Sequence, residues 1–128
     1  MRKPSRKTLR KKSLNTLPKL KRKAWKLFSK YICKRDDYIC FTCGKAGNQA
    51  GHFRHGRLDF DEMNVNCQCA RCNKWLHGRL DEYAIRLKAK YGEKKFDALV
   101  SRSNQFNDYT REDLEKIIKK YAQIKESH

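Results

Sequence analysis

The chain has 128 residues and a formal net charge of +18, with 36% charged and only 38% hydrophobic residues. Such a length and composition allow one small domain with a modest core, for which a bound metal would be a natural supplement. No apolar run approaches the roughly twenty residues that a membrane span requires. We therefore expect no membrane association and a polyanionic partner.

The positive charge is concentrated at the N-terminus. Residues 1–35 contain fifteen Lys and Arg and no acidic residue, whereas residues 36–128 contain seventeen against fourteen acids. Residues 1–15 are nearly free of large apolar side chains, so we expect a disordered basic arm there and a single domain over residues 16–128. A basic block of this kind favours contact with a nucleic-acid backbone.

A long amphipathic helix is predicted after the arm. Thr16 is suited to an N-cap, Pro18 falls in the first turn, and apolar residues recur at steps of three and four as far as Ile32. The opposite face is rich in lysine and predicts DNA contacts by Lys19, Lys23 and Lys26.

The periodicity changes to that of a hairpin from residue 38 onward. We predict a strand over Gln49–Phe53, a polar connection over 54–63, a returning strand over Asn64–Cys69, and a short helix over Ala70–His77 that Gly78 ends. This strand–loop–strand–helix unit is the motif core, residues 38–78.

About three more helices are predicted after the motif core. They cover Leu80–Tyr91, Glu93–Val100 and a segment opened by a capping box at Thr110 to Asp113. The expected fold class is therefore α+β, with a small two-stranded motif between an N-terminal helix and a group of C-terminal helices.

Two Cys-x-x-Cys pairs enclose the predicted hairpin. Four thiolates complete a tetrahedral zinc site with no open position, which is typical of a structural ion. The predicted zinc ligands are Cys40, Cys43, Cys69 and Cys72. Cys67 is the poorer partner for Cys72 because of its spacing, and we expect Cys33 and Cys67 to be reduced and partly buried.

Two other uses of these cysteines are weaker. Disulfides would suit a secreted protein, but no secretory signal follows the basic N-terminus. A redox dithiol would suit a strand–helix–strand setting, which the periodicity does not predict here.

His52, Asn64 and Asn73 are interleaved with the two cysteine pairs. This order resembles the zinc-containing HNH (ββα-metal) endonucleases, and the resemblance implies metal-dependent hydrolysis of phosphodiester bonds. It implies that His52 is the general base, that Asn64 braces the loop and orients His52, and that Asn73 binds a catalytic Mg²⁺ or Mn²⁺.

One position departs from the HNH pattern. Many HNH enzymes have an acidic metal ligand directly before the base, where this chain has Gly51. His77, four residues after Asn73, is the candidate second ligand, although a helix-end role suits it as well. Further candidates in the predicted loop are His55, Asp59 and Asp61.

Basic residues surround the motif segments and are expected to contact DNA phosphates, since arginine offers a bidentate fork to phosphate oxygens. They are Arg54, Arg57, Arg71, Lys74 and Arg79. For Trp75 we expect packing in the core rather than stacking on a base.

Within the HNH class, the chain resembles the NinG (Rap) family of phage recombination proteins. The resemblance covers residues 26–125 and includes Arg35-Asp36, Ala50 to Phe53, Phe60, Gln68-Cys69, Cys72-Asn73 and Gly78. It implies a structure-specific endonuclease that cuts D-loops and Holliday junctions in the host cytoplasm. By analogy with other junction enzymes, the C-terminal helices are a possible homodimer interface. The alternative is a non-catalytic zinc finger that only binds DNA or RNA.

Overall fold

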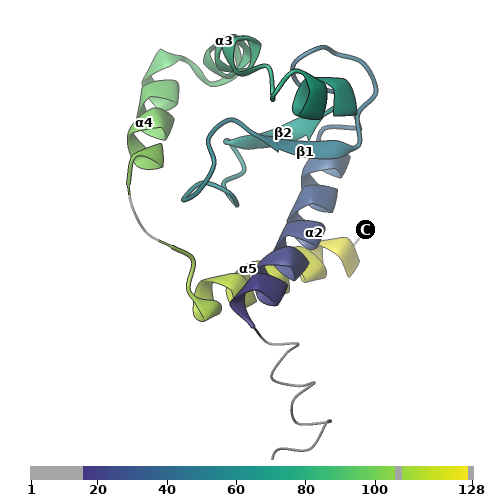
Figure 1. Ribbon diagram of the computed structural model, residues 1–128, viewed down its shortest axis with the longest axis vertical. Helices are drawn as coiled ribbons and strands as arrows, with labels where there is room; N and C mark the ends of the chain where they lie inside the picture. The colour runs from purple at the N-terminus through teal and green to yellow at the C-terminus, as the bar shows by residue number, and fades with distance from the viewer. Residues whose placement is uncertain (1–15, 106–107, 127–128) are drawn as a thin grey trace, which may run out of the picture. The chain divides into compact units, whose positions relative to one another are not determined.

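The computed structural model describes residues 16–105 and 108–126, so the predicted basic arm lies outside the described residues (Figure 1). The described residues divide into two compact units, one of residues 29–105 with 108 and one of residues 16–28 with 109–126. The single domain predicted over residues 16–128 stays a prediction. Among the described residues, no helix has the length and apolar character that a bilayer crossing demands.

The smaller unit contains the first part of helix α2 (Leu17–Arg35) and helix α5 (Arg111–Glu126). The predicted apolar stripe of α2 is buried at Leu20, Ala24 and Phe28. The Phe28 ring meets that of Tyr121 edge-on, with centroids 5.0 Å apart, so the two helices share an aromatic contact.

Both helices of this unit begin near the predicted positions. The Thr16 carbonyl accepts a hydrogen bond from Leu20 N at 2.9 Å at the start of α2. At the start of α5, Asp113 N donates to Thr110 Oγ1 (3.1 Å) and Thr110 N donates to the Asp113 carboxylate (3.0 Å). The capping box predicted from the sequence is therefore present.

The larger unit contains a two-stranded antiparallel sheet. Strands β1 (Gln49–His52) and β2 (Val65–Gln68) pair with Gln49 opposite Gln68 and with His52 opposite Val65. Every residue of β2 is buried. Each strand is shorter than predicted, because the ladder gives way to a loop after His52, where Phe53 N still donates to Asn64 O at 2.9 Å.

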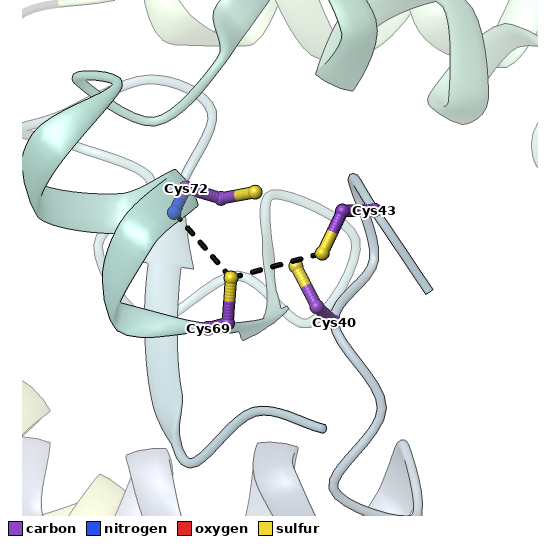
Figure 2. A group of neighbouring side chains, drawn as sticks. All are labelled: Cys40, Cys43, Cys69 and Cys72. Atoms are coloured by element: carbon purple, nitrogen blue, oxygen red, sulfur yellow. Dashed lines mark hydrogen bonds between the residues drawn. The ribbon is translucent and has the colours of Figure 1, made fainter. Parts of the chain in front are cut away.

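The short helix after β2 differs from the prediction. We expected an α-helix over Ala70–His77, whereas η1 (Arg71–Trp75) is a π-helix in which Leu76 N bonds to Arg71 O at 2.9 Å. The wider turn ends before His77, whose φ is +52°. The first residues of η1 face the turn that carries Cys40 and Cys43 (Figure 2).

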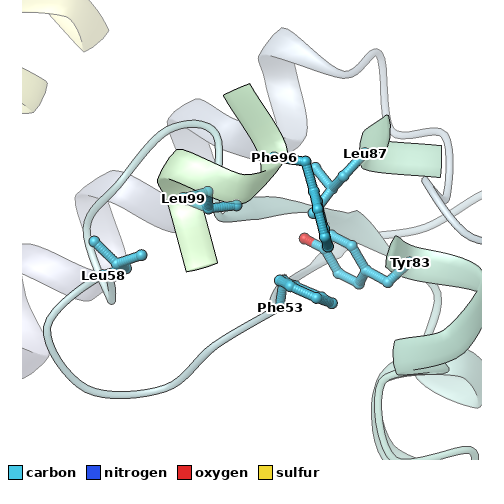
Figure 3. Close-up of a cluster of buried hydrophobic side chains, with 6 residues drawn as sticks. All are labelled: Phe53, Leu58, Tyr83, Leu87, Phe96 and Leu99. Atoms are coloured by element: carbon cyan, nitrogen blue, oxygen red, sulfur yellow. The ribbon is translucent and has the colours of Figure 1, made fainter. Parts of the chain in front are cut away.

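Helices α3 (Leu80–Tyr91) and α4 (Glu93–Ser103) complete the larger unit. The bounds of α3 match the prediction, and α4 continues three residues beyond the predicted Val100. Figure 3 shows the hydrophobic cluster that these helices form with the loop after β1: Phe53, Leu58, Tyr83, Leu87, Phe96 and Leu99. The architecture is thus a mixed α+β fold, as predicted.

The end of α2 is tied to β2 by a charged pair. The Arg35 guanidinium donates to Glu62 O (2.7 Å) and Asn66 Oδ1 (2.9 Å), and it pairs with the Asp36 carboxylate at 2.8 Å. Asp36 in turn accepts a hydrogen bond from Cys67 N at 2.8 Å. These partly buried bonds fix β2 against the helix that precedes the motif core.

Candidate functional site

The four predicted zinc ligands lie together. Their sulfur atoms all lie within 4.8 Å of one another, and Cys43 Sγ is 3.7 Å from Cys69 Sγ (Figure 2). The four residues are Cys40, Cys43, Cys69 and Cys72. Cys40 and Cys72 are buried and the other two are half-buried. Four thiols at this spacing can hold a structural metal ion such as zinc.

The turn that carries the first pair approaches the second pair closely. A Cβ at Gly47 would lie 2.8 Å from Cys69 N and 2.8 Å from the Gln68 carbonyl carbon. Only a glycine allows the two backbones to come this near, so Gly47 brings the pairs together.

The thiols of the first pair differ in acidity. Burial of Cys40 opposes ionisation, but hydrogen bonds from the Thr42 hydroxyl and from backbone groups outweigh it and lower the pKa of Cys40 to about 6. A backbone hydrogen bond at Lys45 favours the Cys43 thiolate, yet burial and the neighbouring sulfurs raise its pKa to about 11. A cation shared by the two sulfurs would favour a Cys43 thiolate beside that of Cys40.

Cys33 and Cys67 lie outside this cluster, as the spacing predicted. They are 3% and 0% exposed, so they are more deeply buried than the expected partial burial. Burial raises the pKa of both thiols, that of Cys67 to about 12, with the charge of Cys33 adding to the effect at Cys67. Both remain protonated, small and apolar at neutral pH.

His52 is the last residue of β1, where the chain enters the loop. Its Nε2 lies 3.2 Å from the carbonyl oxygen of Asp59. A carbonyl can only accept, so in the neutral ring this bond assigns the proton to Nε2 and leaves the lone pair on Nδ1.

Asn64 binds the same loop through its whole carboxamide. Its Nδ2 donates to the carbonyls of Arg54 and Leu58 at 2.8 Å each, and its Oδ1 accepts from Arg54 N at 2.9 Å. Leu58 directly precedes Asp59, whose carbonyl contacts His52. Asn64 is fully buried, so these bonds are shielded from water.

Asn73 lies in η1 beside β1. Its Nδ2 donates to Gln49 Oε1 at 2.9 Å, which directs Oδ1 toward Gly51, where a Cβ would be 3.0 Å away. The same Cβ would overlap Oε1 of Gln68. The space that a side chain at position 51 would occupy is therefore filled by the Gln68 side chain of β2.

Gln68 is held in one orientation. Its Nε2 donates to Gly78 O (2.9 Å) and to Thr42 Oγ1 (3.0 Å), and since Gly78 O only accepts, the amide nitrogen must face it. Oε1 is buried and has no hydrogen-bond partner. Sequence reasoning named Gln68 only as part of the family resemblance and gave it no role in the site, although a polar residue on a buried strand was an available signal.

His77 follows η1 rather than lying within it. The prediction that it shares a helical face with Asn73 assumed an α-helix over both residues, and that premise is wrong because η1 ends at Trp75. Its left-handed φ of +52° places it in the turn before α3.

The predicted DNA-contacting residues are distributed over several segments. Arg54, Arg71 and Lys74 are exposed, and Arg57 is half-buried. Arg79 donates to Thr42 O at 3.4 Å. A hydrogen bond to the Cys72 sulfur raises the pKa of Arg79, so this side chain also contacts the cysteine cluster. In α2, Lys23 and Lys26 are exposed and Lys19 is half-buried.

Trp75 was wrongly predicted to pack in the core. Its side chain is 79% exposed. It is the last residue of the short π-helix η1, and its neighbours Lys74 and Leu76 are exposed as well.

The comparisons with known proteins agree on one family. Residues 2–128 match the family model described as Bacteriophage Lambda NinG protein. Protein ninG of Escherichia phage 933W is 35% identical over 101 residues, which cover 73% of this chain and 50% of that protein. Protein ninG of Escherichia phage lambda is 33% identical over 101 residues, covering 73% and 49%.

This chain thus spans about half the length of these relatives. No solved structure matches it. The match over nearly the whole chain shows that it belongs to the NinG family.

Proposed function

We propose that this protein is an HNH-type endonuclease that hydrolyses phosphodiester bonds in branched DNA with the help of a divalent cation. The observation that carries the proposal is the path from Asn64 to His52. Asn64 holds the Leu58 carbonyl, and the next carbonyl, that of Asp59, contacts His52 Nε2 at 3.2 Å. A histidine held in this way presents Nδ1 as the base.

In this reading, His52 Nδ1 takes a proton from water as the water attacks phosphorus. The contact of Nε2–H with the Asp59 carbonyl keeps the ring in the competent tautomer and stabilises the imidazolium that forms. Asn64 acts through the loop as a positioning residue.

The residues beside Gly51 fit a hard divalent cation. Asn73 Oδ1 is directed there, and Gln68 Oε1 is a buried oxygen that no hydrogen-bond donor satisfies. Amide oxygens are suitable ligands for Mg²⁺ and Mn²⁺, which retain several waters and take further oxygens from phosphate. Asn73 would hold the ion, and the ion would neutralise phosphate charge.

The distribution of positive charge indicates where the substrate binds. The exposed residues Arg54, Arg71 and Lys74 flank the segments that carry His52 and Asn73, and they are proposed to contact backbone phosphates. Exposed Trp75 offers a flat surface on which an unpaired base can stack. Unpaired bases occur at branch points, so this feature favours branched over linear duplex DNA.

The test is cleavage of a D-loop and a Holliday junction, with linear duplex for comparison, in Mg²⁺, Mn²⁺ or a chelator. We expect divalent-dependent nicking that falls by about 10²-fold or more in His52→Ala. His128→Ala removes a histidine without an assigned role and serves as the control. Equal rates in His52→Ala and the parent would refute the assignment of the base.

Binding without cleavage in every divalent ion would instead favour the zinc-finger alternative. The measured mass of the complex distinguishes a monomer from the homodimer that paired cuts at a junction would use.

A further inference from the structure

The loop after β1 gathers a second set of metal-ligating side chains. His52, His55 and Asp59 each offer one ligand atom, and these atoms lie within 4.8 Å of one another. Across residues 16–105 and 108–126, only this set and the four cysteines group three or more such residues. His52 and Asp59 are half-buried and His55 is exposed, so an ion can reach them.

The backbone of the loop holds Asp59 in place. Gly56 N donates to Asp59 Oδ1 at 2.8 Å, and Asp59 N donates to Gly56 O at 3.1 Å, so the turn is closed from both sides. The same Oδ1 lies 3.5 Å from His52 Nε2. The carboxylate is therefore fixed beside the imidazole before any ion binds.

His55 is the third member of the set and lies beside His52. The two imidazole centroids are 4.9 Å apart, with the ring planes inclined by 47°. Ligand atoms about 2.1 Å from one ion in tetrahedral geometry are about 3.4 Å apart. Because His55 is exposed, rotation of its side chain can supply the remaining approach.

We propose that His52, His55 and Asp59 form a binding site for one divalent transition-metal ion of the Zn²⁺, Co²⁺ and Ni²⁺ class. Two imidazoles and one carboxylate suit these ions, whereas Mg²⁺ prefers oxygen ligands alone. The site uses neither the four thiols nor Asn73.

An ion at this site competes with the role proposed for His52. Binding at Nε2 displaces the proton that this atom shares with the Asp59 carbonyl, and binding at Nδ1 occupies the basic lone pair. Either way the ring no longer accepts a proton from water. This consequence rests on the proposed function, whereas the site itself does not.

The test is a Co²⁺ titration of the full chain with zinc already bound at the cysteines, followed by NMR of the histidine ring protons. The chain has four histidines, so each can be assigned. We expect the His52 and His55 signals to broaden at one equivalent, before those of His77 and His128. Absorption in the thiolate-to-cobalt region should stay unchanged, which excludes exchange at the cysteines.

Two substitutions test the ligands without removing the base. His55→Gln and Asp59→Asn should each weaken Co²⁺ binding at His52 by about tenfold or more. Asn at position 59 can still accept from Gly56 N, so the turn is retained. His77→Gln is the matched control and should leave the titration unchanged.

The proposal is overturned if His52 is unaffected by Co²⁺, if His77 broadens first, or if His55→Gln binds as tightly as the parent. A second measurement compares cleavage in Mg²⁺ with and without added Zn²⁺, as a ratio within each variant. Zn²⁺ should inhibit the parent strongly and His55→Gln weakly. If no variant cleaves DNA, the proposed function fails while the titration still decides the metal site.

Discussion

The carboxamide of Gln68 occupies the space in which a side chain at Gly51 would begin. The two residues lie on neighbouring strands, with Gln68 opposite Gln49 and Gly51 opposite Asn66. An acidic residue at position 51 would have to displace Gln68 from Gly78 and Thr42. The departure from the usual HNH pattern is thus linked to a polar side chain on the opposite strand.

Gly51→Ala should therefore destabilise the protein. We expect a loss of about 1–3 kcal/mol in the free energy of unfolding, because the added methyl overlaps Gln68 Oε1. Urea denaturation of Gly51→Ala, Gln68→Ala and the double variant measures this. The added cost of Gly51→Ala should shrink in the Gln68→Ala background, and additive costs would show that the two sites do not interact.

Substitution of Cys69 should release the zinc ion, whereas substitution of Cys67 should not. Cys69→Ser removes a ligand from the four-sulfur cluster, whereas Cys67 lies outside it. Elemental analysis should find one zinc per chain in the parent and in Cys67→Ser, and much less in Cys69→Ser. A chelator should lower the melting temperature of the parent, since metal binding and folding are coupled. Retained zinc in Cys69→Ser would contradict the ligand set.

Asn64→Asp should impair cleavage more than folding. The variant keeps the oxygen that accepts from Arg54 N, but it loses the amide nitrogen that donates to the carbonyls of Arg54 and Leu58. Both carbonyls would then face a carboxylate oxygen. We expect about 10²-fold slower cleavage, as small displacements of a catalytic group have effects of this size. Rates are compared at a temperature where circular dichroism shows the variant folded.

Asn48→Asp, at an exposed asparagine, is the control for Asn64→Asp and should cut at the parent rate. Equal rates for both variants would show that the loop needs no brace from Asn64.

Trp75→Ala should weaken binding to branched DNA without loss of stability. The side chain is 79% exposed, so little packing is removed. Stacking on one base contributes about 1–3 kcal/mol, which is about 5- to 150-fold in affinity. Fluorescence anisotropy with a junction and a linear duplex measures the difference. Ile85→Ala is the control, since it removes a different exposed apolar side chain, one in α3. It should leave the affinity for the junction and for the linear duplex unchanged.

The sequence predicted those features that depend on local patterns. Apolar periodicity located the hairpin and matched the bounds of α3, and the spacing of the cysteines identified the cluster without Cys67. The π-helix was missed because, over only five residues, apolar periodicity does not separate π-helical from α-helical hydrogen bonding.

Two side chains around the site were also misjudged or overlooked. A tryptophan in a helix is usually buried, but η1 is so short that Trp75 falls at its exposed end. Gln68 was given no role in the site because its contact with Gly51 is made across the two strands. Such contacts depend on register, which a single sequence does not specify in detail.

The hydroxyl of Tyr83 makes the motif core dependent on helices outside it. Tyr83 donates to the Gly51 carbonyl at 2.7 Å and accepts from Asn66 Nδ2 at 3.0 Å, while its ring joins the cluster of α3 and α4. Excision of residues 38–78 would leave a buried carbonyl and a buried amide without their phenol. The hairpin therefore cannot be transferred alone to another protein. A host scaffold would need its own donor for the Gly51 carbonyl, directly before His52.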